Sequence, residues 1–202
     1  MLCFLEFVSK KDALFKRMLR KQVEKIVRMQ NFFFLLLSCI LLIFAGCTGI
    51  PAGVKPVSNL NLASYQGTWY EIARIENWFE RDTQQVSATY TLRDDGFVDV
   101  VNRGFDPQKQ KWREAKGLAK PVEGSAPGHL KVSFWGPFYG SYIVFECGAN
   151  YEYAFVCGYK KTYLWLLARK KSVSKSVMER FLDVSKKKGF DLNNLVITKH
   201  TP

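Results

Sequence analysis

The feature that most constrains the fold is a series of short strand-like segments between residues 69 and 169, separated by turn residues. Residues 86–92 show the pattern most clearly, because their apolar side chains alternate onto one face of an extended chain. A hairpin turn follows at Asp94, Asp95 and Gly96, where glycine tolerates a positive φ. The eight predicted strands are residues 69–75, 86–92, 97–105, 112–120, 130–135, 142–147, 151–159 and 163–169.

Strands at this near-regular spacing predict an all-β sandwich or barrel. Consecutive hairpins favour an antiparallel up-and-down barrel, since closing the sheet removes its exposed edges. An eight-stranded barrel has an interior that can hold one small ligand. The spacing of the strands by itself leaves both the barrel and the sandwich open.

One α-helix is predicted after the strands, over residues 174–188, and we expect it to pack on the wall of the sheet. Ser174 can cap it, and Val173 and Met178 are placed for a hydrophobic staple. Gly189 ends the helix. A last short strand is predicted at residues 195–198.

The N-terminal region reads as a signal segment. Residues 32–44 are 13 uncharged residues, too short to span a bilayer as a helix and typical of a signal peptide. Ala45, Gly46 and Cys47 follow, which resembles the bacterial lipoprotein signal, although Phe44 stands where leucine is usual. This resemblance implies that the Cys47 thiol is acylated, and Thr48 after it favours the outer membrane. An ordinary secretory signal, cleaved near Ala45 or Gly46, is the alternative.

These observations divide the chain into a signal segment at residues 1–46, a lipidated flexible tether at 47–58 and a barrel domain at 59–202. The basic region before the apolar run is unusually long, and Met18 would give a more ordinary start. We therefore expect residues 1–17 not to be translated.

The net charge of +12 first suggests nucleic acid or an anionic membrane as a partner. Residues 1–46 contain eight basic and three acidic residues, and the rest of the chain 22 and 15. No nucleic-acid-binding module accompanies them, so we predict no nucleic-acid partner. The basic residues are interpreted as solvated surface, with a patch facing anionic lipid as the alternative.

Cysteine and histidine spacing predicts no metal site. No cysteines stand in C-x-x-C spacing, and His129 and His200 lie far apart. Cys147 and Cys157 fall in one predicted hairpin, but with a turn at residues 148–150 they stand about 20 Å apart, too far for a disulfide. We expect two buried free thiols.

Catalytic motifs are missing from the sequence as well. It contains no G-x-S-x-G elbow, no H-E-x-x-H and no phosphate-binding glycine loop. We predict no enzymatic activity and no cofactor.

Residues 67–74, Gly-Thr-Trp-Tyr-Glu-Ile-Ala-Arg, resemble the motif that opens the first strand in lipocalins, members of the calycin superfamily. In lipocalins an arginine at the end of the eighth strand lies across the tryptophan, and Arg169 stands at that position here. The resemblance therefore implies that Gly67, Trp69, Tyr70 and Arg169 close the barrel.

The segments at residues 89–96, 102–105, 131–140 and 154–158 resemble the bacterial outer-membrane lipoprotein branch of that family. The resemblance covers roughly residues 55–198. It implies binding of fatty acids or (lyso)phospholipids for membrane maintenance under stress, an anchor in the outer membrane with the domain facing the periplasm, and in some members a homodimer.

Aromatic residues are the candidates for the ligand cavity or its rim, because a ring-lined cavity suits an acyl chain. The candidates are Tyr90, Trp135, Phe138, Tyr142, Tyr153 and Trp165. Arg74, Arg93 and Arg103 could meet a charged headgroup, but we expect them in solvent. A pigment or haem-like ligand is the first alternative to a lipid, and a lipid-processing enzyme the second.

Overall fold

A computed structural model describes residues 21–22, 24–34 and 47–201 of the chain. The chain divides into two units, residues 1–45 and 46–202. In the first unit the described residues are helical. Among the described residues, no helix combines the length and apolar character that crossing a membrane requires. The predicted signal segment, residues 1–46, falls mostly outside the described residues.

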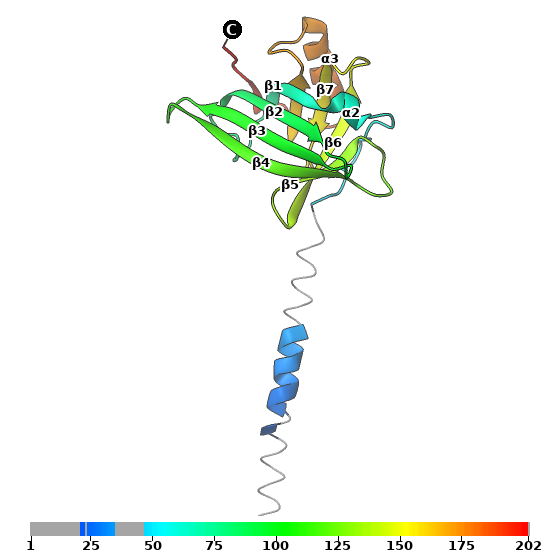
Figure 1. Cartoon of the computed structure of the whole chain (residues 1–202), viewed down its shortest axis with the longest axis vertical. Coiled ribbons are helices and arrows are strands. Elements are labelled where there is room, and N and C mark those ends of the chain that lie inside the picture. Colours follow the sequence, from blue (N-terminus) through cyan, green and yellow to red (C-terminus); the bar gives the residue numbers. More distant parts are fainter. Residues whose placement is uncertain (1–20, 23, 35–46, 202) are drawn as a thin grey trace, which may run out of the picture. The chain divides into compact units, whose positions relative to one another are not determined.

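The second unit is a closed antiparallel barrel of eight strands, β1 to β8, with β9 added beside β1 (Figure 1). Each strand pairs with the next, and pairing between β1 and both β2 and β8 closes the sheet. The elements are α2 (Leu62–Tyr65), β1 (Gly67–Ile75), β2 (Gln84–Leu92), β3 (Val98–Asp106), β4 (Lys111–Pro121), β5 (His129–Trp135), β6 (Phe138–Cys147), β7 (Tyr153–Cys157), β8 (Leu164–Ala168), α3 (Lys175–Lys187) and β9 (Leu195–Ile197).

The predicted eight-stranded barrel with one C-terminal helix on its wall is confirmed. The Ser174 hydroxyl caps α3 by accepting from the Val177 amide, and Gly189 after the helix has a φ of +78°. Phe181 from α3 and Phe190 after it are buried on the barrel wall against Phe155 and Phe145.

The two ends of the barrel differ, and we call them the floor and the mouth. The floor is the end at which β1 begins and α2 crosses. Because neighbouring strands alternate in direction, the floor also holds the β2–β3, β4–β5 and β6–β7 turns. The mouth holds the β1–β2, β3–β4, β5–β6 and β7–β8 turns.

Trp69 and Arg169 close the floor. The Arg169 guanidinium lies 4.1 Å from the centroid of the fully buried Trp69 ring. It donates to three carbonyl oxygens, those of Thr68, Ser64 and Tyr65, and so ties α2 to β1. The Trp69 indole N–H donates to the Tyr65 carbonyl at 2.7 Å. Gly67 has a φ of +96°, and a side chain there would press on the Arg169 guanidinium.

Buried side chains form two clusters on opposite faces of the barrel wall. One fills the interior around Trp69, Val100 and Val156. The other lies outside the wall beneath α3, around Ile143 and Phe155. Strand alternation assigns each residue to one cluster or the other.

The segment at residues 47–58 differs from the expected flexible tether. It runs along β6 as a strap, with Val54 buried in the cluster beneath α3. The Val57 amide donates to the Val144 carbonyl at 2.9 Å, and the Val57 carbonyl accepts from Gly128 at 3.0 Å. Its glycines and prolines suggested flexibility, but its apolar side chains and backbone hydrogen bonds hold it on the barrel.

Cys147 and Cys157 are free thiols, as expected. The predicted register was wrong, however: Cys147 pairs with Ala154, because the β6–β7 turn is longer than three residues. Cys147 packs against the interior cluster and Cys157 belongs to the cluster beneath α3. The two side chains therefore lie on opposite faces of the wall. Burial raises the pKa of Cys157 to about 12 and that of Cys147 to about 11.

We predict that Arg169→Ala lowers the free energy of unfolding by about 2 kcal/mol, because it removes a cation–π contact and leaves three carbonyls short of a charged donor. Arg103→Ala is the matched control: its guanidinium also lies over a tryptophan, 4.2 Å from the Trp112 centroid, but on the exposed outer wall. It should cost less than about 0.5 kcal/mol. Urea unfolding measures both, and equal losses would contradict the role given to Arg169.

Candidate functional site

One rung of small side chains faces the barrel interior. Ala88, Asn102 and Ala115 pair across β2, β3 and β4 and point inward by alternation from the buried Val98, Val100 and Ala119. Ala88 and Asn102 are only half-buried and Ala115 is exposed. β4 pairs with β5 only from Leu118 to Pro121, which leaves the wall beside Ala115 uncovered.

Three tyrosine hydroxyls meet inside the barrel above the floor. The Tyr142 hydroxyl lies 2.7 Å from that of Tyr65 and 2.9 Å from that of Tyr90. Burial raises the pKa of all three well above 10, so they stay neutral at physiological pH. Tyr65 also stacks on Trp69 with ring centroids 4.6 Å apart. The lower interior is therefore aromatic, with a small neutral hydrogen-bonding centre.

A buried ion pair lies inside the wall nearer the mouth. Arg74 is 1% exposed and Glu71 2%, and the Arg74 Nη1 donates to the Glu71 carboxylate at 2.7 Å. Burial alone would lower the pKa of Arg74, but the neighbouring Glu71 carboxylate reverses this and the net shift is upward. Thr198, from the C-terminal segment, also donates to Glu71. This arrangement keeps both charges inside the wall.

The expectation that Arg74 lies in solvent is wrong. A β-bulge between Glu71 and Ala73 turns Arg74 inward, onto the same face as Glu71. Arg93 and Arg103 are exposed, as expected.

The β1–β2 loop at the mouth is held to this ion pair by Glu80. The Glu80 carboxylate accepts from the Trp165 indole N–H at 2.9 Å and from the Asn77 amide at 2.6 Å, and the Glu80 carbonyl accepts from Arg74 at 3.0 Å. Burial raises the pKa of Glu80 to about 7, and the Glu71 carboxylate adds to the increase. Glu80 therefore titrates near neutral pH.

Four buried polar atoms have no hydrogen-bond partner among the described residues: Arg74 Nε, Asn102 Oδ1, Ser133 Oγ and Ser185 Oγ. Of these, Arg74 and Asn102 belong to inward-facing side chains. An unpaired buried polar atom is costly, so the two inward atoms suit a polar ligand group or a water molecule. Aromatic walls with a few convergent polar atoms fit an amphiphilic ligand.

The structure separates the six predicted ligand-binding aromatics into three groups. Tyr90, Tyr142 and Trp165 lie in or against the interior cluster. Trp135 and Phe138 stand on the exposed β5–β6 hairpin at the mouth. Tyr153 packs against the cluster beneath α3, and its hydroxyl donates to the Glu146 carboxylate. The prediction that Tyr153 lines the ligand cavity or its rim is therefore wrong.

Sequence reasoning missed four residues of the interior: Tyr65, Glu71, Glu80 and Asn102. Strand alternation from Trp69 could have placed Glu71 inward. Glu80 lies in a loop and reaches the interior only through the fold of that loop, which has no sequence pattern.

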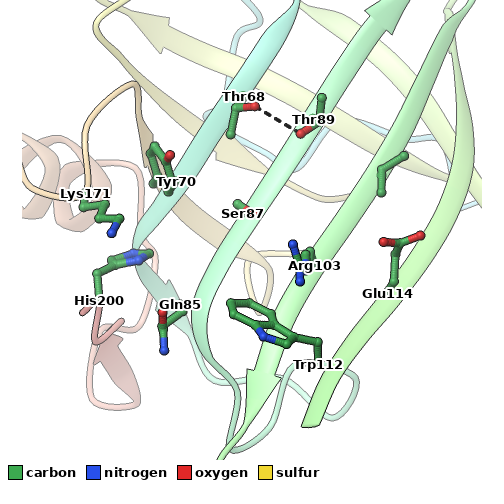
Figure 2. Close-up of a pocket in the computed structure, with 11 residues that line it drawn as sticks. Thr68, Tyr70, Gln85, Ser87, Thr89, Arg103, Trp112, Glu114, Lys171 and His200 are labelled. Carbon is green, nitrogen blue, oxygen red and sulfur yellow. Dashed lines mark hydrogen bonds between the residues drawn. The ribbon is translucent and has the colours of Figure 1, made fainter. Parts of the chain in front are cut away.

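An open groove of about 540 Å³ lies outside the barrel, on β1 to β4 (Figure 2). Its lining is largely polar and includes Arg103, Glu114, Lys171 and His200. Figure 2 shows Arg103 and Glu114 standing on strands, Lys171 and His200 on segments outside the strands, and the Thr68 and Thr89 hydroxyls, which are hydrogen bonded at 3.2 Å. Tyr70, Val101 and Trp112 contribute apolar surface to the same groove. Among the described residues no cluster of His, Cys, Asp or Glu could hold a metal ion.

Comparison with known proteins decides the family. The family model for a lipocalin-like domain matches residues 60–200. The chain belongs to the lipocalin family. The match spans every strand of the barrel and α3, so the floor and interior described above are those of a lipocalin.

The lipocalin is similar to bacterial proteins named outer membrane lipoprotein Blc. That of Vibrio cholerae serotype O1 is 51% identical over 164 residues, which cover 81% of this chain and 95% of the relative. That of Escherichia coli K12 is 42% identical over 146 residues, covering 72% and 82%. Insecticyanin from the tobacco hornworm Manduca sexta shares the fold, with a TM-score of 0.61 at 20% identity over 75% of this chain and 86% of that one.

We predict that the lipocalin loses stability as the pH rises through the range between the ordinary pKa of a glutamate, 4.5, and the value of about 7 for Glu80. The folded state holds the Glu80 proton more tightly than the unfolded state, so removing that proton favours unfolding. Glu80→Gln should flatten this part of the profile, measured by urea unfolding between about pH 5 and about pH 8. Glu123→Gln, at the floor, is the control and should keep the wild-type profile. An unchanged profile in Glu80→Gln would exclude Glu80 as its source.

Proposed function

We propose that this lipocalin is an outer-membrane lipoprotein, acylated on Cys47, whose barrel binds a fatty acid or lysophospholipid for membrane maintenance under stress. The observation that carries the proposal is the interior: a closed aromatic floor, an accessible rung of small side chains and two unpaired polar atoms facing inward. An acyl chain would gain from apolar burial there, and its headgroup would meet the polar atoms.

The names of the similar bacterial proteins support the location. Both Blc relatives are named as outer membrane lipoproteins, and in this chain Cys47 is an exposed free thiol at the start of the barrel unit. We place the domain on the periplasmic side. The protein acts as a carrier or store rather than an enzyme, with no cofactor, and pairing of two copies is a separate part of the proposal.

Native mass spectrometry of the mature protein, stripped of bound lipid and titrated with oleate and with a lysophospholipid, tests ligand binding. We expect one molecule of lipid to saturate each barrel. The same spectra report whether two copies pair. A protein that gains neither lipid, or that carries a visible absorbance band from a bound pigment, would contradict the proposal.

Ala88→Trp should weaken lipid binding by at least about tenfold, because it fills the accessible rung inside the barrel. Thr89→Trp is the matched control, since the next residue along β2 points to the outer groove. Thermal unfolding should show that both variants fold. Equal affinities for the two variants would place the lipid elsewhere.

The intact mass of protein extracted from membranes tests acylation. We expect a chain that begins at Cys47 and carries the added mass of a diacylglyceryl group on its thiol. The acyl chains of this group supply the membrane anchor. Cys47→Ser should leave the precursor uncleaved and without lipid. A wild-type chain cleaved near residue 46 without added lipid would indicate an ordinary secretory signal.

A further inference from the structure

The exposed large apolar side chains of the barrel unit gather at the mouth. Trp135 is 83% exposed and Phe138 62%, both on the β5–β6 hairpin, and Trp78 in the β1–β2 loop is 75% exposed. Phe79, beside Trp78, is also exposed and contacts Tyr163 and Trp165. Within residues 47–201 no large apolar side chain of the floor turns is exposed to this extent. Clustered exposed aromatics mark an interaction surface.

Charge divides the barrel in the same direction. The mouth turns carry the basic residues Arg81, Lys109, Lys160 and Lys161. Within residues 47–201, Asp82 is the acidic residue of these turns that is exposed. The floor turns carry Asp94, Asp95, Glu123 and Glu152. Arg93 in the β2–β3 turn and Arg169, Lys170 and Lys171 directly after β8 balance these acidic residues. The mouth therefore combines exposed aromatic rings with an excess of positive charge, and the floor does not.

Cys47 is fixed at the mouth with no free spacer. It forms a parallel bridge with Gly140, two residues from Phe138, which is about 7 Å along an extended strand. The Ser141 amide donates to the Cys47 carbonyl at 2.9 Å, and the Cys47 side chain is hydrogen bonded with Tyr159 in the β7–β8 turn. In Figure 1 the described part of the barrel unit begins beside the β5–β6 hairpin. Acyl chains on Cys47 would enter a membrane next to the mouth.

We infer that the mouth of the barrel rests on an anionic phospholipid surface, with Trp135 and Trp78 in the interfacial layer, so that the opening faces the leaflet from which a lipid enters. This inference rests on the proposed acylation of Cys47. Tryptophan and tyrosine prefer the membrane interface, and basic side chains are attracted to anionic headgroups. The floor then points away from the membrane.

The test uses the mature acylated protein in vesicles of phosphatidylethanolamine and phosphatidylglycerol whose acyl chains carry bromine, which quenches nearby tryptophans. Trp135→Phe and Trp78→Phe together should remove most of the quenchable emission, since these are the two tryptophans that lie in the interface. Ala149→Trp adds an exposed tryptophan in the β6–β7 turn at the floor and should add emission that bromine does not quench. All three sites are exposed, so the variants should fold as the wild type does.

The result that would overturn the inference is quenching of the floor tryptophan, or quenching unchanged in Trp135→Phe and Trp78→Phe. Shielding of Trp135 and Trp78 from aqueous acrylamide without bromolipid quenching would assign the mouth to a second protein copy and overturn it too. Intact mass on the same sample separates the two proposals. An unacylated protein contradicts the proposed function, whereas an acylated, vesicle-bound protein with unquenched mouth tryptophans contradicts the inference alone.

Discussion

The contact between Arg169 and Trp69 is the interaction on which the rest of the structure depends. It joins the end of β8 to the start of β1, which are the strands that close the barrel, and its hydrogen bonds fix α2 across the floor. Because one end is closed by packing and hydrogen bonds, the other end can stay open. The barrel therefore has two unlike ends: a closed aromatic floor and an accessible mouth.

The interior combines features that a purely structural core would not need. A filled core pairs its buried polar atoms and excludes small residues from facing positions. Here small side chains share one inward rung, and Arg74 Nε and Asn102 Oδ1 are unpaired among the described residues. The tyrosine hydroxyls remain neutral, and the inward cation Arg74 is already balanced by Glu71. Such an interior suits a long apolar chain with a single polar end better than a highly charged ligand.

The fold was largely predictable from the sequence because its determinants are local. Alternation along β2, the turn at Gly96 and the cap at Ser174 each depend on neighbouring residues, and all are found in the structure. The interior was less predictable. The bulge in β1 turned Arg74 inward, and the phase of β7, with Ala154 and Val156 inward, placed Tyr153 outside the barrel. The strap was misjudged for a similar reason, since its fixed course depends on contacts with distant strands.

Residue-resolved photo-crosslinking with a fatty acid that carries a diazirine near its methyl end tests the central claim most directly. β2 and β3 place inward and outward side chains at alternate positions, so adjacent residues report the two faces of one wall. If the lipid lies inside the barrel, adducts should form at Ala88, Tyr90 and Asn102. Adducts at Thr89, Val101 and Arg103, which line the outer groove, would contradict the account.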